Sequence, residues 1–127
     1  MNAFFALFPP LTLLCFLLGV VFLIGAQITL RYPPKKINSL YGYRTKNSMK
    51  SQQHWDFAQR YSSIKMKAVG LIYLLMGGLF YFLNYESVAV GLLIGITTVP
   101  PLVLLLQTEN AIKTQFPKDA PKEKEGE

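Results

Sequence analysis

The sequence predicts an all-α membrane protein with three transmembrane helices and a cytoplasmic amphipathic helix in the loop between the first two. Three observations predict this fold. Apolar residues make up 51% of the 127 residues, three stretches are long and apolar enough to cross a bilayer, and the basic residues fall in only two regions. A chain of this length holds one domain and has no room for a large soluble core as well.

The first predicted span covers residues 11–30, and its only polar members are Thr12, Gln27 and Thr29. A helix of about twenty residues crosses roughly 30 Å of hydrocarbon. Two prolines precede this span, where a missing N–H does no harm at a helix start. No Lys or Arg precedes it and no small-residue cleavage site follows, so an uncleaved span is expected rather than a secretory signal.

The second and third predicted spans cover residues 68–85 and 88–106. The link of residues 84–87 between them is too short for a domain, so these two helices are expected to form an antiparallel hairpin.

Small and helix-breaking residues mark the third span. Gly91 and Gly95 form a GxxxG pattern, which permits a close approach between helices, here expected to seat the third span against the second. Pro100 and Pro101 each remove a helical N–H and disturb the carbonyl four residues earlier, so a kink is expected there. In the second span, Tyr73 is expected to hydrogen-bond between helices as part of the packing.

The distribution of basic residues predicts the orientation. Nine of the thirteen Lys and Arg lie in residues 31–67, and the other four follow residue 106. By the positive-inside rule the loop and the C-terminus are cytoplasmic and the N-terminus is outside, in a multi-pass protein of the cell membrane. Residues 1–108 form one transmembrane domain. Residues 109–127, rich in Lys, Glu and Pro, are predicted to be a disordered cytoplasmic tail.

The residue types do not favour catalysis. Cys15 is the only cysteine and lies among apolar residues, so neither an intramolecular disulfide nor a thiolate metal site can form. The spans carry no charged side chain of the kind that intramembrane chemistry or ion transport uses. His54 and Asp56 are two positions apart and do not face each other on a helix. The sequence therefore predicts no enzyme, no metal and no cofactor.

The loop of residues 31–67 combines positive charge with a compact motif. Its basic residues are expected to attract anionic lipid by roughly 1 kcal/mol each near the surface. Turn formers, aromatic residues and an arginine follow one another in residues 38–45, and Ser51 is well placed to cap a helix. Beyond it, apolar residues recur at helical spacing and predict an interfacial face, with Gln59 and Arg60 toward the polar side. These apolar positions are Trp55, Ala58, Tyr61 or Ser62, and Ile64.

The residues that carry the most specific pattern are Asn38, Tyr41, Gly42, Tyr43, Arg44, Thr45, Ser48, Ser51, Trp55 and Ala58. Between two apolar spans, this arrangement resembles the signature of the SdpI family, small bacterial membrane proteins named for an immunity protein against the sporulation-delay toxin. The similarity covers roughly residues 15–105. The sequence departs from the family pattern at Gln52 and Gln53, where acids are usual, and at Gln59, where Asn is common. Longer members carry additional N-terminal spans.

The resemblance implies protection of the producing cell from a secreted, membrane-damaging toxin. In the founding system this is coupled to sequestering a cytoplasmic repressor at the membrane. The implied partners are therefore a peptide toxin or a transcriptional repressor, besides a bilayer with anionic lipids, and no direct contact with nucleic acid is expected. The site residues carried over by position are Asn38, Tyr41, Gly42, Tyr43, Arg44, Thr45 and Trp55.

Structural roles for three of these residues remain open: Gly42 permitting a turn, Trp55 anchoring the loop helix and Arg44 binding a lipid phosphate. The alternative function is a small transporter or an accessory subunit of one, and a homo-oligomer is left open.

Overall fold

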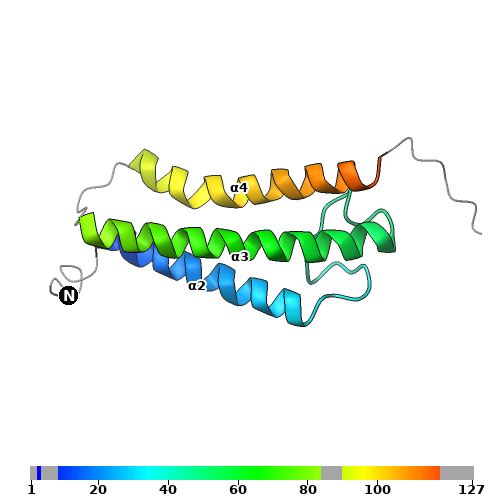
Figure 1. Ribbon diagram of the computed structural model, residues 1–127, viewed down its shortest axis with the longest axis horizontal. Helices are drawn as coiled ribbons and strands as arrows, with labels where there is room; N and C mark the ends of the chain where they lie inside the picture. The colour runs from blue at the N-terminus through cyan, green and yellow to red at the C-terminus, as the bar shows by residue number, and fades with distance from the viewer. Residues whose placement is uncertain (1–2, 4–8, 84–89, 118–127) are drawn as a thin grey trace, which may run out of the picture.

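The computed structural model describes residues 3, 9–83 and 90–117, and in these residues the chain forms three long α-helices (Figure 1). They are α2 (Pro10–Arg31), α3 (Gln52–Leu83) and α4 (Val90–Gln115). Each is long and apolar enough to cross a membrane, so the chain is a multi-pass, all-helical membrane protein, as the sequence predicted. The central helix is α3, which packs against both of the others.

Prolines precede and follow α2 and set its bounds. Pro9 caps it, and the amide of Leu13 donates the first hydrogen bond to the Pro9 carbonyl at 3.1 Å. Pro10 fills the first helical position, where its fixed φ suits the helix. At the other end the helix stops at Arg31, because Tyr32 precedes Pro33 and a residue before proline disfavours helical geometry.

Glycines allow α2 and α3 to pack closely. A Cβ added at Gly70 would lie 3.0 Å from the carbonyl oxygen of Gly19, so the two backbones meet almost directly. Toward the start of α2, Cys15 is fully buried and its Cβ would lie 3.2 Å from a Cβ added at Gly77. Close packing of small residues therefore joins the first two spans, with Cys15 as a packing residue.

The prediction that Gly91 and Gly95 seat α4 against α3 was wrong. A Cβ added at either glycine would meet no atom of the described residues within 4 Å. α4 instead contributes Ile96 and Leu104 to the core. The GxxxG pattern shows that one face of the helix carries small residues. Whether that face contacts another helix depends on how the helices pack.

The Tyr73 hydroxyl donates a hydrogen bond to α4 near the two prolines, which have no N–H groups of their own. This fully buried hydroxyl lies 2.9 Å from the Ile96 carbonyl, to which it donates, and 3.4 Å from the carbonyl of Thr97. These carbonyls lie four residues before Pro100 and Pro101, which have no N–H to offer them. α4 continues through both prolines. Tyr73 thus satisfies backbone acceptors that would otherwise face hydrocarbon.

We expect Tyr73→Phe to lower the free energy of unfolding by about 0.6 kcal/mol and by no more than about 1.7 kcal/mol, the range for hydrogen bonds between transmembrane helices. Chemical unfolding in detergent micelles measures this change. Tyr61→Phe is the control, because the Tyr61 hydroxyl bonds to no described residue. Equal stability of the two variants would show that the carbonyls near the prolines need no donor from α3.

The start of α3 differs from the predicted interfacial helix. Ser51 caps α3 as predicted, accepting from the His54 amide at 3.3 Å. Residues 32–51, all of them described, contain no separate amphipathic helix, and the predicted one forms the first turns of α3. Of the predicted apolar face, Trp55 and Ala58 are fully buried inside the protein, whereas Ile64 is 52% exposed. The helical period placed Trp55 and Ala58 on one face correctly, but it did not show that they would be buried by the protein itself.

The end of α4 also lies beyond the predicted boundary. Disorder was expected from residue 109, whereas the helix continues to Gln115. Leu104, Thr108 and Ile112 form one buried stripe at intervals of four residues, and Phe116 stacks on His54 with ring centroids 4.2 Å apart. The buried stripe lets the charged end of α4 pack against the rest of the protein and remain helical. The predicted link of residues 84–87 and the last residues of the tail, 118–127, lie outside the described residues.

Candidate functional site

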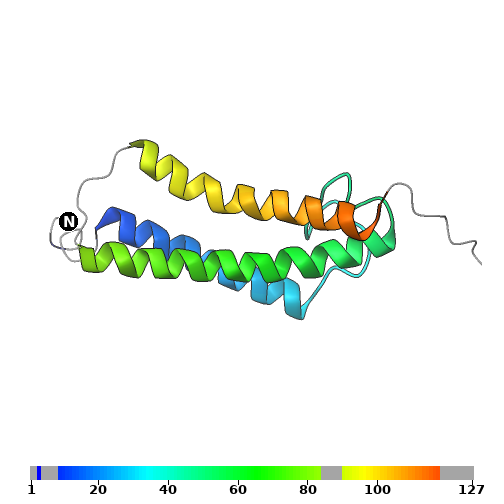
Figure 2. The same cartoon turned by 45° about the horizontal axis from the view of Figure 1, so that its top comes forward.

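The segment of residues 32–51, here termed the docked loop, folds against two helices at one end of the molecule. In Figure 1 and Figure 2 it lies beside the start of α3 and the end of α4. All seven predicted site residues lie in this loop or, as Trp55 does, directly against it. Hydrogen bonds to α3 and α4 hold the loop in one shape.

A turn around Asn38 opens the compact part of the loop. The Asn38 side-chain oxygen accepts from the amides of Leu40 at 3.0 Å and Tyr41 at 2.8 Å, and its nitrogen donates to the Lys36 carbonyl at 3.0 Å. Asn favours such turns because its side chain reproduces a backbone turn. The Tyr41 hydroxyl then donates to the Tyr32 carbonyl at 3.0 Å, which ties the turn to the end of α2.

Gln59 of α3 binds the middle of the loop through both ends of its amide. Its oxygen accepts from the Tyr43 amide at 2.7 Å, and its nitrogen donates to the Tyr43 carbonyl at 2.8 Å. Gln59 is only 3% exposed, so the prediction that it lies on the polar side of the helix was wrong. A buried amide is tolerated because its donor and acceptor are both paired.

Gly42 permits this close contact. Its φ is +104°, a value that side-chain-bearing residues rarely adopt. A Cβ at this position would overlap the side-chain oxygen of Gln59 and lie 2.8 Å from Pro34 Cγ. Glycine is therefore required both by the backbone conformation and by the space beside Gln59.

Thr45 and Ser48 cap each other in the next turn. The Thr45 amide donates to Ser48 Oγ at 2.8 Å, and the Ser48 amide donates to Thr45 Oγ1 at 3.2 Å. The buried Ser48 hydroxyl also lies 3.1 Å from the Tyr43 carbonyl. Reciprocal capping of this kind satisfies backbone groups without regular secondary structure.

Trp55 fastens the beginning of the loop to α3. Its ring is fully buried, and its Nε1 donates to the Pro34 carbonyl at 2.7 Å. A buried tryptophan places a large apolar surface in the core while its N–H finds an acceptor. The position of Trp55 fits the anchoring role that the sequence left open.

Glu109 of α4 holds the other side of the loop, and sequence reasoning missed it. Its carboxylate accepts from the Tyr43 hydroxyl at 2.9 Å and from the Asn47 side-chain nitrogen at 2.6 Å. Burial raises the pKa of the Tyr43 phenol, and the hydrogen bond to Glu109 raises it further, so Tyr43 stays a donor near neutral pH. The spacing of Leu104, Thr108 and Ile112 is the signal that would have extended α4 to this carboxylate.

We expect Tyr43 and Glu109 to stabilise the fold as a coupled pair. Tyr43→Phe and Glu109→Gln each remove part of a charge-assisted hydrogen bond, which contributes about 1.5–3 kcal/mol. In a double-mutant cycle the two losses should not add, with a coupling of at least about 0.5 kcal/mol in unfolding experiments in detergent. Asn110→Ala, at an exposed position of the same helix, is the neutral control. Strict additivity would show that the bond contributes nothing to stability.

Arg44 lies on the exposed side of the docked loop. One guanidinium nitrogen, Nη1, donates to the Ser39 carbonyl and spans the turn. The other guanidinium N–H groups bond to no residue that the structure describes, although arginine has five such donors. Leu40 beside this turn is 89% exposed, and Tyr41 is partly exposed. Arg44, Tyr41 and Leu40 therefore form the outward surface of the loop.

Within the described part of the chain, no group of three or more His, Cys, Asp or Glu side chains is arranged to hold a metal ion. The site thus consists of a hydrogen-bonded loop, two helix ends and one exposed basic and apolar surface. This arrangement is suited to binding a partner in a fixed geometry.

Comparison with known proteins places this region in a family context. The model of the SdpI/YfhL protein family matches residues 35–106, from the docked loop through α3 into α4. The chain is 48% identical over 59 residues to the uncharacterized protein YfhL of Bacillus subtilis (strain 168). This match covers 46% of the chain and 53% of the relative, so the chain spans about half the length of that relative. No solved structure matches the chain significantly.

Proposed function

The chain belongs to the SdpI/YfhL family, and from this premise we propose that it is a membrane immunity protein that protects the cell against a membrane-active peptide toxin. It acts by binding and not by catalysis. The docked loop is the binding surface, and its partner is the toxin at the membrane or a cytoplasmic regulator that responds to the toxin.

The observation that carries this proposal is the order of the docked loop. A loop that only connects two spans needs no buried polar network, because each buried polar group is unfavourable unless it is fully paired. Here Gln59 and Glu109, from two different helices, pair with the same residue, Tyr43. The family match also begins in this loop. A fixed loop presents Arg44 and its neighbours at little further entropic cost on binding.

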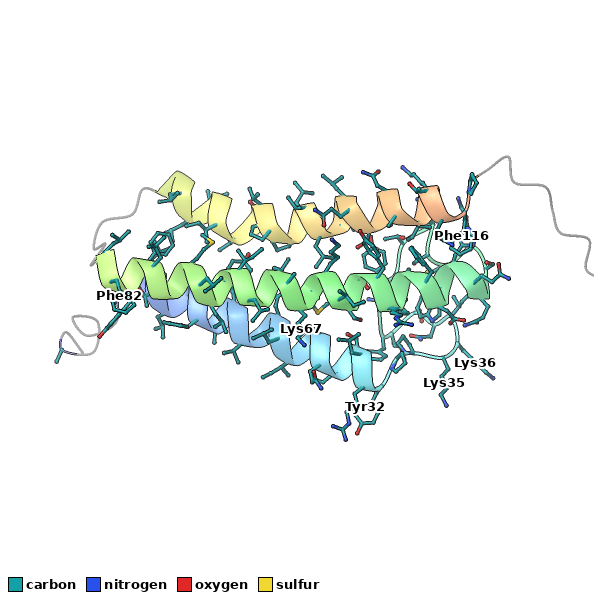
Figure 3. All side chains as sticks on the ribbon, viewed as in Figure 1. Tyr32, Lys35, Lys36, Lys67, Phe82 and Phe116 are labelled. Carbon is teal, nitrogen blue, oxygen red and sulfur yellow. The ribbon has the colours of Figure 1, made fainter. Side chains whose placement is uncertain are left out.

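The proposed orientation puts the docked loop in the cytoplasm and the N-terminus outside. Nine of the thirteen Lys and Arg lie in residues 31–67. In Figure 3, Lys35 and Lys36 lie at the same end of the molecule as Phe116, whereas Phe82 lies at the opposite end. A basic end of the helical bundle favours the cytoplasmic side of the membrane.

We expect the chain to raise the survival of a toxin-sensitive bacterium exposed to the sporulation-delay toxin, relative to cells with an empty vector. Arg44→Ala and Arg44→Lys should both abolish this protection at unchanged membrane abundance, since a guanidinium forks onto a carboxylate or phosphate in a way that an ammonium cannot. Lys36→Ala, in the same loop, should keep it.

Two outcomes would contradict the proposal at different levels. Equal survival with and without the parent chain would overturn the immunity function itself. Full protection by Arg44→Lys, with protein levels checked by blot, would remove Arg44 from the binding surface.

A further inference from the structure

A second feature, separate from the exposed surface of the docked loop, lies between the end of α2 and the first turns of α3. The two helices diverge toward this end in both Figure 1 and Figure 2. A half-open cavity of about 630 Å³ occupies the space between them. Its volume falls within the range of roughly 300–1,000 Å³ that is typical of small-molecule sites.

The walls of the cavity are largely apolar, and its charges are few. Leu30, Pro33 and Pro34 supply apolar surface, and the charged lining residues are Lys35, Asp56 and Arg60. Two cations and one carboxylate leave the cavity with a formal charge of +1.

The cations of this cavity have no anionic partner within the described chain. Neither Lys35 nor Arg60 forms an ion pair with a described residue. The Asp56 carboxylate instead accepts from the side-chain nitrogen of Gln52 at 2.7 Å. Arg60 therefore keeps its planar set of donors available beside an apolar wall, where an anion would be held more strongly than in open water.

The depth of the cavity in the membrane indicates the kind of anion. Leu30 lies in the last turn of α2, where the apolar span ends, and the basic loop begins directly after it. This is the level at which phospholipid headgroups lie. A phosphate at this level is joined to acyl chains, and Ile24 and Ile28 of α2 are exposed apolar residues of the kind that such chains contact.

We propose that this cavity binds the headgroup of a monoanionic phospholipid of the phosphatidylglycerol class, with Arg60 and Lys35 holding the phosphodiester. A single negative charge balances the +1 of the cavity, whereas the zwitterionic lipids phosphatidylethanolamine and phosphatidylcholine bring no net charge. The site requires neither a toxin nor a regulator, so it extends beyond the proposed immunity function.

The test is native mass spectrometry of the detergent-solubilised chain, titrated separately with phosphatidylglycerol, phosphatidylethanolamine and phosphatidylcholine. We expect the first phosphatidylglycerol to bind about tenfold more tightly than either zwitterionic lipid, which corresponds to one charge-assisted interaction. Arg60→Gln should abolish this preference. Lys36→Gln removes an equal charge from the docked loop, outside the cavity, and should retain the preference.

For Asp56→Asn we expect a change of phosphatidylglycerol affinity in the opposite direction. It raises the formal charge of the cavity from +1 to +2 and should tighten phosphatidylglycerol binding severalfold. Inorganic phosphate in large excess should not displace the lipid, because the acyl chains contribute to binding. Displacement would show that the ligand is a free phosphate group and would overturn the lipid assignment.

Folding of the variants is checked by thermal unfolding in the same detergent without lipid. Arg60 is exposed and bonds to no described side chain, so the parent midpoint is expected. If Arg60→Gln failed to fold, Lys35→Gln would provide the same test. Equal affinity of the parent for all three lipids, or an unchanged preference in a folded Arg60→Gln or Lys35→Gln variant, would overturn the proposal.

Discussion

Gly42→Ala should release the docked loop and lower the free energy of unfolding by about 2–4 kcal/mol. A positive φ of this kind strains an L residue by roughly 1–3 kcal/mol. The added methyl also overlaps the side-chain oxygen of Gln59, so the hydrogen bonds to Tyr43 must lengthen or break. Each buried group left unpaired is unfavourable by about 1–3 kcal/mol, part of which the loop recovers by moving toward water.

Chemical unfolding in detergent measures this change, and hydrogen exchange at the Tyr43 amide locates it. Gly78→Ala is the matched control, since a Cβ at this helical glycine meets no atom within 4 Å. It should leave the chain unchanged or stabilise it by up to roughly 1 kcal/mol. Equal stability of Gly42→Ala and Gly78→Ala would contradict the positive φ of Gly42 and its close contact with Gln59.

Gln59→Leu should lower the free energy of unfolding by a similar amount, about 2–4 kcal/mol. Leucine fills a similar volume but leaves the Tyr43 amide without a partner and leaves the Tyr43 carbonyl with only the Ser48 hydroxyl, 3.1 Å away. We expect α3 to remain helical, because leucine is a good helix former. The loss should therefore appear as faster hydrogen exchange in residues 42–48.

The control for this variant is Gln53→Leu, the same substitution at an exposed position of α3. It should change stability by no more than about 0.5 kcal/mol. Protection of the Tyr43 amide that survived in Gln59→Leu would contradict the pairing of Gln59 with the loop.

The three spans could be predicted from the sequence because the signal is local. A helix that crosses a bilayer needs about twenty consecutive apolar residues, and residues 11–30 and 68–85 show this without reference to any partner. The cap at Ser51 could be predicted for the same reason, since it depends only on the next three residues. The predicted site residues also lie together, because most of them are neighbours in one short loop.

The rest depends on contacts between distant residues. Gln59 is a polar residue whose burial makes sense only with Tyr43, sixteen positions earlier, as its partner. Composition alone predicts that Glu109 belongs to a disordered tail. It does not reveal that Tyr43 and Asn47 of the loop donate hydrogen bonds to its carboxylate. Gly91 and Gly95 form the pattern expected for a close helix approach, but in the structure that approach is made by Gly19 and Gly70. In each case the sequence identified residue types, and the packing decided their roles.

The docked loop and the proposed lipid cavity share a boundary. Gln59 and Pro34 line the cavity and also hold the loop, Gln59 through Tyr43 and Pro34 through Trp55. A headgroup in the cavity would therefore lie against the same residues that fix the loop. Both proposed sites therefore lie at the end of the molecule formed by the last turn of α2 and the first turns of α3.

The central claim is that the docked loop is the working part of the protein. It is tested most directly by the survival of toxin-sensitive cells that express Gln59→Leu or Tyr73→Phe at equal membrane abundance, under exposure to the sporulation-delay toxin. Both substitutions weaken the structure, but only Gln59→Leu releases the loop. The account predicts that Gln59→Leu loses protection while Tyr73→Phe keeps it. Full protection by Gln59→Leu would contradict the claim.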